Sequence, residues 1–168
     1  MIRSFDGKTP KIAESAFVSE VAHVIADVEI GENSGLWPGV VVRGDVSSIK
    51  IGRNTIIEDN SVIHTDEPME IGDNVVVGHG AVVHCKKIGN NTLIGNNAVV
   101  LGKAQIGSHC VIGAGCLVTQ GMEIPDNSFV VGVPARIKGQ VSPEQRLLPR
   151  AITQYYVGLL ERYKQQGL

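Results

Sequence analysis

Apolar residues recur every six positions along most of the chain. Twenty such positions between residues 12 and 130 hold isoleucine, valine or leucine, and glycine directly follows eight of them. An α-helix repeats every 3.6 residues and a hairpin sheet alternates every two, so neither accounts for a period of six. The repeating positions are Ile12, Val18, Val24, Ile30, Leu36, Val42, Ile51, Ile57, Ile63, Ile71, Val77, Val83, Ile88, Ile94, Val100, Ile106, Ile112, Val118, Ile124 and Val130.

A stack of triangular coils accounts for this period. Each hexapeptide forms one flat face and a turn, so three of them complete a coil, and successive coils stack about 4.8 Å apart. The repeating aliphatic side chains point inward, each over its counterpart one coil away, and glycine supplies the permissive backbone at the corners. Short side chains two positions earlier let the chain turn inside a narrow prism; they include Ala16, Ala22, Ala98, Ala104, Cys110 and Cys116.

Three steps break the six-residue spacing. The step from Val42 to Ile51 is nine residues, the step over 63–71 is eight and the step over 83–88 is five. His64 and His84 are twenty residues apart, whereas one coil takes about eighteen. The loop at residues 65–70 and the later five-residue step can absorb this difference, so we expect the coils on either side to remain in phase.

The repeat over residues 10–135 resembles the hexapeptide-repeat family, whose coils form a left-handed parallel β-helix. The resemblance predicts an all-β domain at residues 1–135, with a short N-terminal lead-in, and it is the source of the handedness. Residues 136–168 are expected to form a helical cap that packs on the β-helix, since a solenoid needs capped ends.

The C-terminal residues carry the signals of an amphipathic helix. Ser142 suits the N-cap, Pro143 the first turn, and Gln145 completes the capping pattern. We expect Pro149 to kink or restart the helix. Beyond it an apolar stripe should pack along one face of the prism; its residues are Ile152, Tyr155, Tyr156, Leu159, Leu160 and Tyr163.

Composition narrows the classes of function. Lys and Arg number 15 against 17 Asp and Glu, a formal net charge of −2. This balance argues against a partner that needs a basic face, such as nucleic acid or a membrane surface. No apolar run approaches the roughly 20 residues of a membrane span. The chain begins without the pattern of a signal peptide, and its three cysteines form no disulfide framework, so we expect a cytoplasmic protein.

Three of the five histidines are candidates for chemistry, whereas His23 and His109 are expected to be exposed polar residues. His64 and His84 each follow an inward residue, so they occupy the same position, or phase, in the six-residue repeat. Their side chains should therefore point outward from the same face in adjacent coils. That separation lets two imidazoles bind one metal ion. His79 has the other phase and reaches such an ion only across an interface between two prisms. The spacing therefore predicts either a three-histidine metal site shared between subunits or interface histidines without a metal.

Several motifs are similar to the gamma-class carbonic anhydrase family. They are Arg-Gly-Asp at 43–45, Glu-Asp-Asn-Ser-Val-Ile-His at 58–64, and Val-Gly-His-Gly-Ala-Val-Val-His at 77–84. The closing stretches at 112–115 and 131–135 also match. The resemblance implies a homotrimer that binds zinc, with iron or cobalt as alternatives.

The same resemblance assigns roles to the histidines. His64 and His84 correspond to the two metal ligands from one subunit, and His79 to the ligand from its neighbour. The three imidazoles leave one coordination position for water, and the metal-bound hydroxide converts CO₂ reversibly to bicarbonate at the subunit interface.

Other positions match the family in part. The resemblance implies an intersubunit ion pair between Arg43 and Asp59, with Asp45 facing the same region. Glu58 departs from the usual glutamine beside the hydroxide: an ionised carboxylate accepts a hydrogen bond but cannot donate one. Its charge should raise the pKa of the bound water, unless Glu58 acts as a general base. Ile56 replaces a common asparagine.

Several side chains have both a structural and a functional interpretation. Cys85 follows His84 and could lie near the metal, and Tyr155 or Tyr156 could reach the pocket from the helix, although packing is the simpler interpretation for each. Glu67 and Glu70 are weak candidates for proton transfer.

Two other functions fit the same scaffold. One is a hexapeptide-repeat acyltransferase, which places a catalytic histidine between prisms but needs no cluster of three. The other is a non-catalytic metal-binding homologue, an interpretation that Glu58 and Ile56 keep open.

Overall fold

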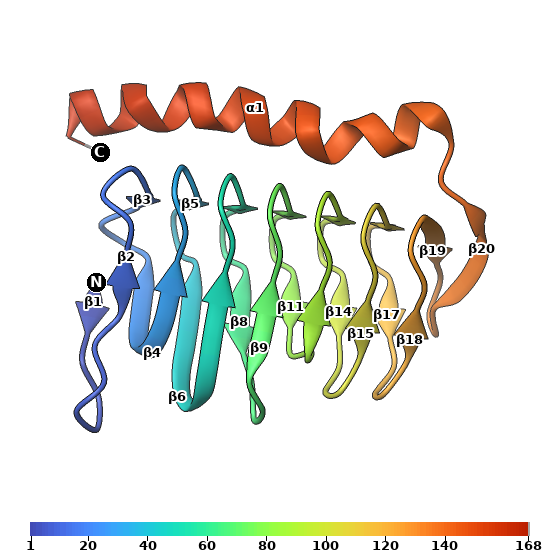
Figure 1. Cartoon of the computed structure of the whole chain (residues 1–168), viewed down its shortest axis with the longest axis horizontal. Helices are drawn as coiled ribbons and strands as arrows, with labels where there is room; N and C mark the ends of the chain where they lie inside the picture. Colours follow the sequence, from blue (N-terminus) through green and yellow to red (C-terminus); the bar gives the residue numbers. More distant parts are fainter. Residues whose placement is uncertain (168) are drawn as a thin grey trace.

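The chain forms a parallel β-helix of about seven turns with a long helix, α1 (Pro143–Gln166), along one side (Figure 1). The structure is a computed structural model that describes residues 1–167. The fold predicted from the six-residue period is confirmed. Eighteen of the twenty repeating aliphatic residues are buried inside the coils, and only Ile12 and Val18, in the first coil, are partly exposed.

One face of the prism lies under α1, and we call it the covered face. Its outward residues include Phe17 and Ile56, and α1 packs on them through Tyr156, Leu160 and neighbouring side chains. The apolar stripe predicted for the helix is therefore in contact with the prism. The strands of this face are β3 (Phe17–Val18), β5 (Gly35–Leu36), β7 (Ile56–Ile57), β10 (Val76–Val77), β13 (Leu93–Ile94), β16 (Val111–Ile112) and β19 (Ser128–Val131).

A second face exposes a column of alternating charges, and we call it the charged face. Opposite charges lie directly across from one another in adjacent strands, as in Glu29, Lys50, Glu70 and Lys87. Cross-strand pairs of opposite charge stabilise the sheet, and their charged side chains favour exposure of this face to solvent. Its strands are β2 (Lys11–Ile12), the later parts of β4 (His23–Ile30) and β6 (Val41–Ile51), β9 (Met69–Ile71), β12 (Lys87–Ile88), β15 (Gln105–Ile106) and β18 (Glu123–Ile124).

The third face carries an apolar column that nothing among residues 1–167 covers, and we call it the uncovered apolar face. Val41, Val62, Val82, Val99 and Leu117 stack in register on its outside, and Val82 is 41% exposed. Its strands are β1 (Ile2–Arg3), the early parts of β4 and β6, β8 (Val62–His64), β11 (Val82–Val83), β14 (Val99–Val100) and β17 (Leu117–Val118).

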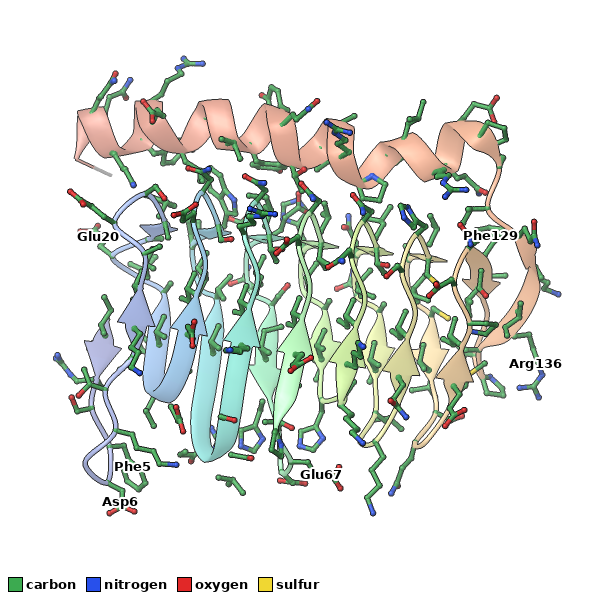
Figure 2. The ribbon with its side chains drawn as sticks, in the orientation of Figure 1. Phe5, Asp6, Glu20, Glu67, Phe129 and Arg136 are labelled. Carbon is green, nitrogen blue, oxygen red and sulfur yellow. The ribbon has the colours of Figure 1, made fainter. Side chains whose placement is uncertain are left out.

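All three breaks in the six-residue spacing fall at one corner, between the uncovered apolar face and the charged face. We call it the histidine corner; it comprises residues 43–48, 64–68 and 84–87. Strands β4 and β6 run continuously around this corner, which joins the two faces into one sheet. Figure 2 shows Glu67 at this edge, on the opposite side of the solenoid from α1.

The C-terminal region differs from the expectation in two respects. Of the two alternatives expected at Pro149, the restart is wrong, because α1 continues through this buried residue. The kink stays a prediction. Strand β20 (Arg136–Gln140) pairs antiparallel with β19 before the helix begins, so five residues expected in the helical cap extend the sheet. The predicted cap at Ser142 is present, with its capping box. No helix among residues 1–167 is long and apolar enough to cross a membrane.

The stacked interior predicts a large cost for removing one inward side chain. Ile94 is fully buried, so Ile94→Ala should lower the free energy of unfolding by about 2–5 kcal/mol. Lys87→Ala, on the charged face, is the matched control and should change it by less than about 0.5 kcal/mol. Urea denaturation followed by circular dichroism measures both, and equal losses in the two variants would contradict the inward column.

Candidate metal centre

His64 and His84 lie together at the histidine corner, as their shared phase predicts. The residues that precede them, Ile63 and Val83, are direct partners in adjacent strands. The two imidazole ring centroids are 5.3 Å apart, and the rings are tilted by 48°. The strand register therefore brings two metal-binding side chains side by side.

Asp66 completes a group of three potential ligands. One donor atom from each of His64, Asp66 and His84 lies within 4.8 Å of the others. Asp66 Oδ2 is 3.5 Å from His84 Nε2. The sequence analysis did not single out Asp66, although the lengthened step after Ile63 marked its loop.

Arg43 and Asp45 support His64 from strand β6. Arg43 Nη1 donates a hydrogen bond to Asp45 Oδ2, and Asp45 Oδ1 lies 3.2 Å from His64 Nε2. Partial burial raises the pKa of Asp45, but the hydrogen bonds from Arg43, the backbone and His64, together with the positive charge of Arg43, outweigh it, and the pKa lies below its usual value. Asp45 therefore remains ionised and can orient the imidazole.

His79 lies at a different corner, between the covered face and the uncovered apolar face. We call it the Glu58 corner; it comprises residues 58–61 and 78–81. His79 Nδ1 is 3.0 Å from Asp59 Oδ2, and His79 Nε2 is 3.2 Å from Glu58 Oε2. Strand β11 separates His79 from His84, so His79 is not part of the group at the histidine corner. Asp59 pairs here with His79, and its predicted pairing with Arg43 of another subunit stays a prediction.

Glu58 is a buried acid that also faces α1. It is 7% exposed. Burial, followed by the nearby Glu58 carboxylate, raises the pKa of Tyr156. The Tyr156 ring also stacks edge-on against Trp37, with centroids 5.2 Å apart. Of the two tyrosines considered, Tyr156 therefore reaches Glu58, whereas Tyr155 is 69% exposed.

The donor chemistry at the histidine corner fits a divalent metal. Two imidazoles and one carboxylate are ligands that zinc, ferrous iron and cobalt accept. Asp45 is placed as the outer carboxylate that commonly orients a ligating histidine. The residues present therefore fit the kind of group that the resemblance implies.

Cys85 is a core residue rather than part of this group. Its side chain points into the solenoid and is 2% exposed, and burial raises the pKa of the thiol to about 12. Cys110 and Cys116 are also buried, as predicted for the small inward positions.

The stacked parallel coils and the six-residue repeat define a hexapeptide-repeat β-helix protein. Residues 86–120 match the family described as Bacterial transferase hexapeptide (six repeats). A Bacillus cereus protein described as a candidate acetyltransferase has a crystal structure that superimposes with a TM-score of 0.94. It is 36% identical and covers 98% of this chain, which covers 97% of it.

Curated relatives narrow the class. The protein named "Probable carbonic anhydrase" from Methanocaldococcus jannaschii is 42% identical over 91% of this chain and 99% of its own length. Gamma carbonic anhydrase 1 of Arabidopsis thaliana is 42% identical over 45% of this chain and 30% of its own length. The chain belongs to the gamma carbonic anhydrase-like family of hexapeptide-repeat proteins. It spans less than half the length of some curated carbonic anhydrases that it matches.

The burial of Cys85 gives a direct test of the site's surroundings. Because its thiol is buried and its pKa is about 12, Cys85 should resist alkylation by iodoacetamide at pH 8 in the native protein. Peptide mass spectrometry should find this residue modified only after denaturation in urea. Rapid modification in the native protein would place Cys85 at the surface, beside the histidines.

Proposed function

We propose that the protein is a metal-dependent carbonic anhydrase of the gamma type, which hydrates CO₂ reversibly to bicarbonate. The observation that carries the proposal is the pairing of His64 and His84 at one corner, in a chain that aligns along almost its whole length with a carbonic anhydrase relative. The metal is zinc, with ferrous iron or cobalt as alternatives. When bound, such a metal lowers the pKa of water towards neutrality and so supplies the nucleophile for CO₂.

The proposed ligands come from two subunits. His64 and His84 hold the metal from one chain, and His79 of the partner subunit supplies the third imidazole. In each chain the Asp59 carboxylate lies 3.0 Å from His79 Nδ1, and a proton held between these two atoms would leave the Nε2 lone pair for the metal. This placement puts Glu58, 3.2 Å from that nitrogen, at the reaction site.

The arrangement of the faces supports a homotrimer. The uncovered apolar face is bordered by the Glu58 corner on one side and the histidine corner on the other. If the Glu58 corner of one copy contacts the histidine corner of the next, two different surfaces meet, which is a heterologous interface. Repeating such an interface around a rotation axis forms a closed ring. A ring of three prisms would bring each His79 to the next chain's His64 and His84 and cover the apolar columns.

Two other functions remain as candidates, each favoured by one observation. The charge of Glu58, in place of the family's glutamine, disfavours ionisation of a nearby water, which favours a non-catalytic metal-binding homologue. The likeness to the Bacillus cereus candidate acetyltransferase favours acyl transfer. Acetyl-CoA turnover by the metal-free protein would support acyl transfer, and bound metal without CO₂ hydration would support the non-catalytic homologue.

Metal content tests the proposed centre. The purified protein should contain about one divalent ion per chain by elemental analysis, because each chain contributes one set of ligands. His84→Ala should lose this ion and the CO₂ hydration measured by stopped-flow indicator changes. His109→Asn, at the corner between the charged face and the covered face, is the control and should retain both, because asparagine tolerates the positive φ of this residue. Full metal retention in His84→Ala would exclude the site.

The oligomeric state tests the role of the uncovered apolar face. Size-exclusion chromatography with light scattering should give a trimer for the parent protein. Val82→Lys should dissociate it, because it places a charge in the centre of the apolar column. Gln105→Lys makes the same change on the charged face and should leave the trimer intact. A monomeric parent protein would contradict the shared site.

A further inference from the structure

We propose that Asp66 is a metal ligand, which together with His64 and His84 lets a single chain hold the divalent ion before a second chain supplies His79. This inference rests on the proposed function, since it concerns the same metal. It adds a carboxylate ligand that is later displaced by His79 of the partner subunit, and it gives assembly an order: the metal binds first and the trimer closes over it.

The distance between Asp66 and His84 is that of two ligands of one ion. Asp66 Oδ2 and His84 Nε2 are 3.5 Å apart. A hydrogen bond between a carboxylate and an imidazole is shorter, at about 2.7–2.9 Å. Two donors, each about 2.1 Å from a tetrahedral ion, are separated by about 3.4 Å. The pair therefore fits a shared ion better than a direct hydrogen bond.

The loop that carries Asp66 is held in place by its own hydrogen bonds. Thr65 is 3% exposed; its hydroxyl donates to the Glu67 carbonyl oxygen and accepts from the Glu67 N–H. Glu67 extends away to Lys103, 4.0 Å from its carboxylate. The two neighbouring acids therefore point to different partners, and Asp66 is the one directed at the histidines.

The orientation of His84 leaves its Nε2 facing Asp66. A Cβ atom at Gly102 would lie 3.4 Å from His84 Nδ1, so glycine at this position gives the ring room on that side. Asp66, His84 and Gly102 line the same small pocket. The side chain of Asp66 is 69% exposed, which leaves it free to move when a partner's histidine takes its place.

The resulting ligand set has defined metal preferences. Two histidines and one carboxylate bind catalytic zinc and non-haem ferrous iron in other proteins. With His79 absent, these three side chains offer one more ligand than the two histidines alone. A single chain should therefore bind zinc or cobalt measurably, and this affinity should depend on Asp66.

Metal binding in a His79→Ala background isolates the ligands of a single chain. Co²⁺ titration followed by visible absorption, and Zn²⁺ competition against bound Co²⁺, measure the affinity without reference to activity. We expect His79→Ala to bind Co²⁺. Adding Asp66→Ala should weaken binding by at least about 100-fold, because loss of a direct ligand should cost no less than the upper end of what loss of an outer carboxylate costs. Adding Asp66→Asn, which preserves the side-chain shape, should also weaken it.

Glu67→Ala in the same background is the matched control, because it removes the adjacent acid of the same loop and should leave the affinity unchanged. Circular dichroism confirms that each variant is folded. The proposal is overturned if Asp66→Ala and Asp66→Asn bind Co²⁺ as tightly as the background, or if His79→Ala alone binds none. The proposed function fails separately if His64→Ala/His84→Ala, made with His79 intact, retains the parent affinity.

Discussion

The stacking of each inward aliphatic side chain on its counterpart one coil away is the constraint on which the rest of the structure depends. Ile57 lies over Leu36 and under Val77, and parallel backbone hydrogen bonds fix the same offset around the coil. Side chains at the same position of the six-residue repeat therefore point out of the prism at the same corner. Aliphatic side chains suit this interior, because a narrow prism has no room for aromatic rings, which instead gather outside, under α1.

Given this regular frame, chemistry concentrates where the frame is interrupted. Insertions at residues 43–48 and 65–68 and the shortened step after Val83 all fall at the histidine corner. These interruptions place acidic side chains beside the imidazoles, and the strands determine the positions of the imidazoles. The Glu58 corner differs, because it keeps the six-residue spacing. It places the buried Glu58 carboxylate between His79 and α1. Rigid strands thus hold the histidines, while loops and α1 supply the groups that surround them.

The features that follow from periodicity could be predicted from the sequence, and those that depend on irregular backbone could not. The phase of His64 and His84 determined their common corner, and the different phase of His79 excluded it from that corner. Asp66 was missed because a loop has no period from which a direction follows. The contact between Tyr156 and Glu58 depends on which turn of α1 crosses the Glu58 corner. The apolar stripe of the helix, read from the sequence, does not specify that turn. The restart at Pro149 was wrong because the preference of proline for a helix end is local, whereas α1 continues through this buried residue.

The alternating charges outside the prism have a consequence for how the chain finds its fold. The interior is nearly the same in every coil, so skipping one coil would still place aliphatic residues over aliphatic residues. The charged face would not tolerate the skip: Lys50 would oppose Lys87, and Glu29 would oppose Glu70, in place of the opposite charges that pair in the native register. Each such pair contributes only about 0.2–1 kcal/mol, but the column adds these contributions. The charges on the solvent-exposed surface thereby favour the native register over one shifted by a coil, whereas the aliphatic core is nearly the same in both registers.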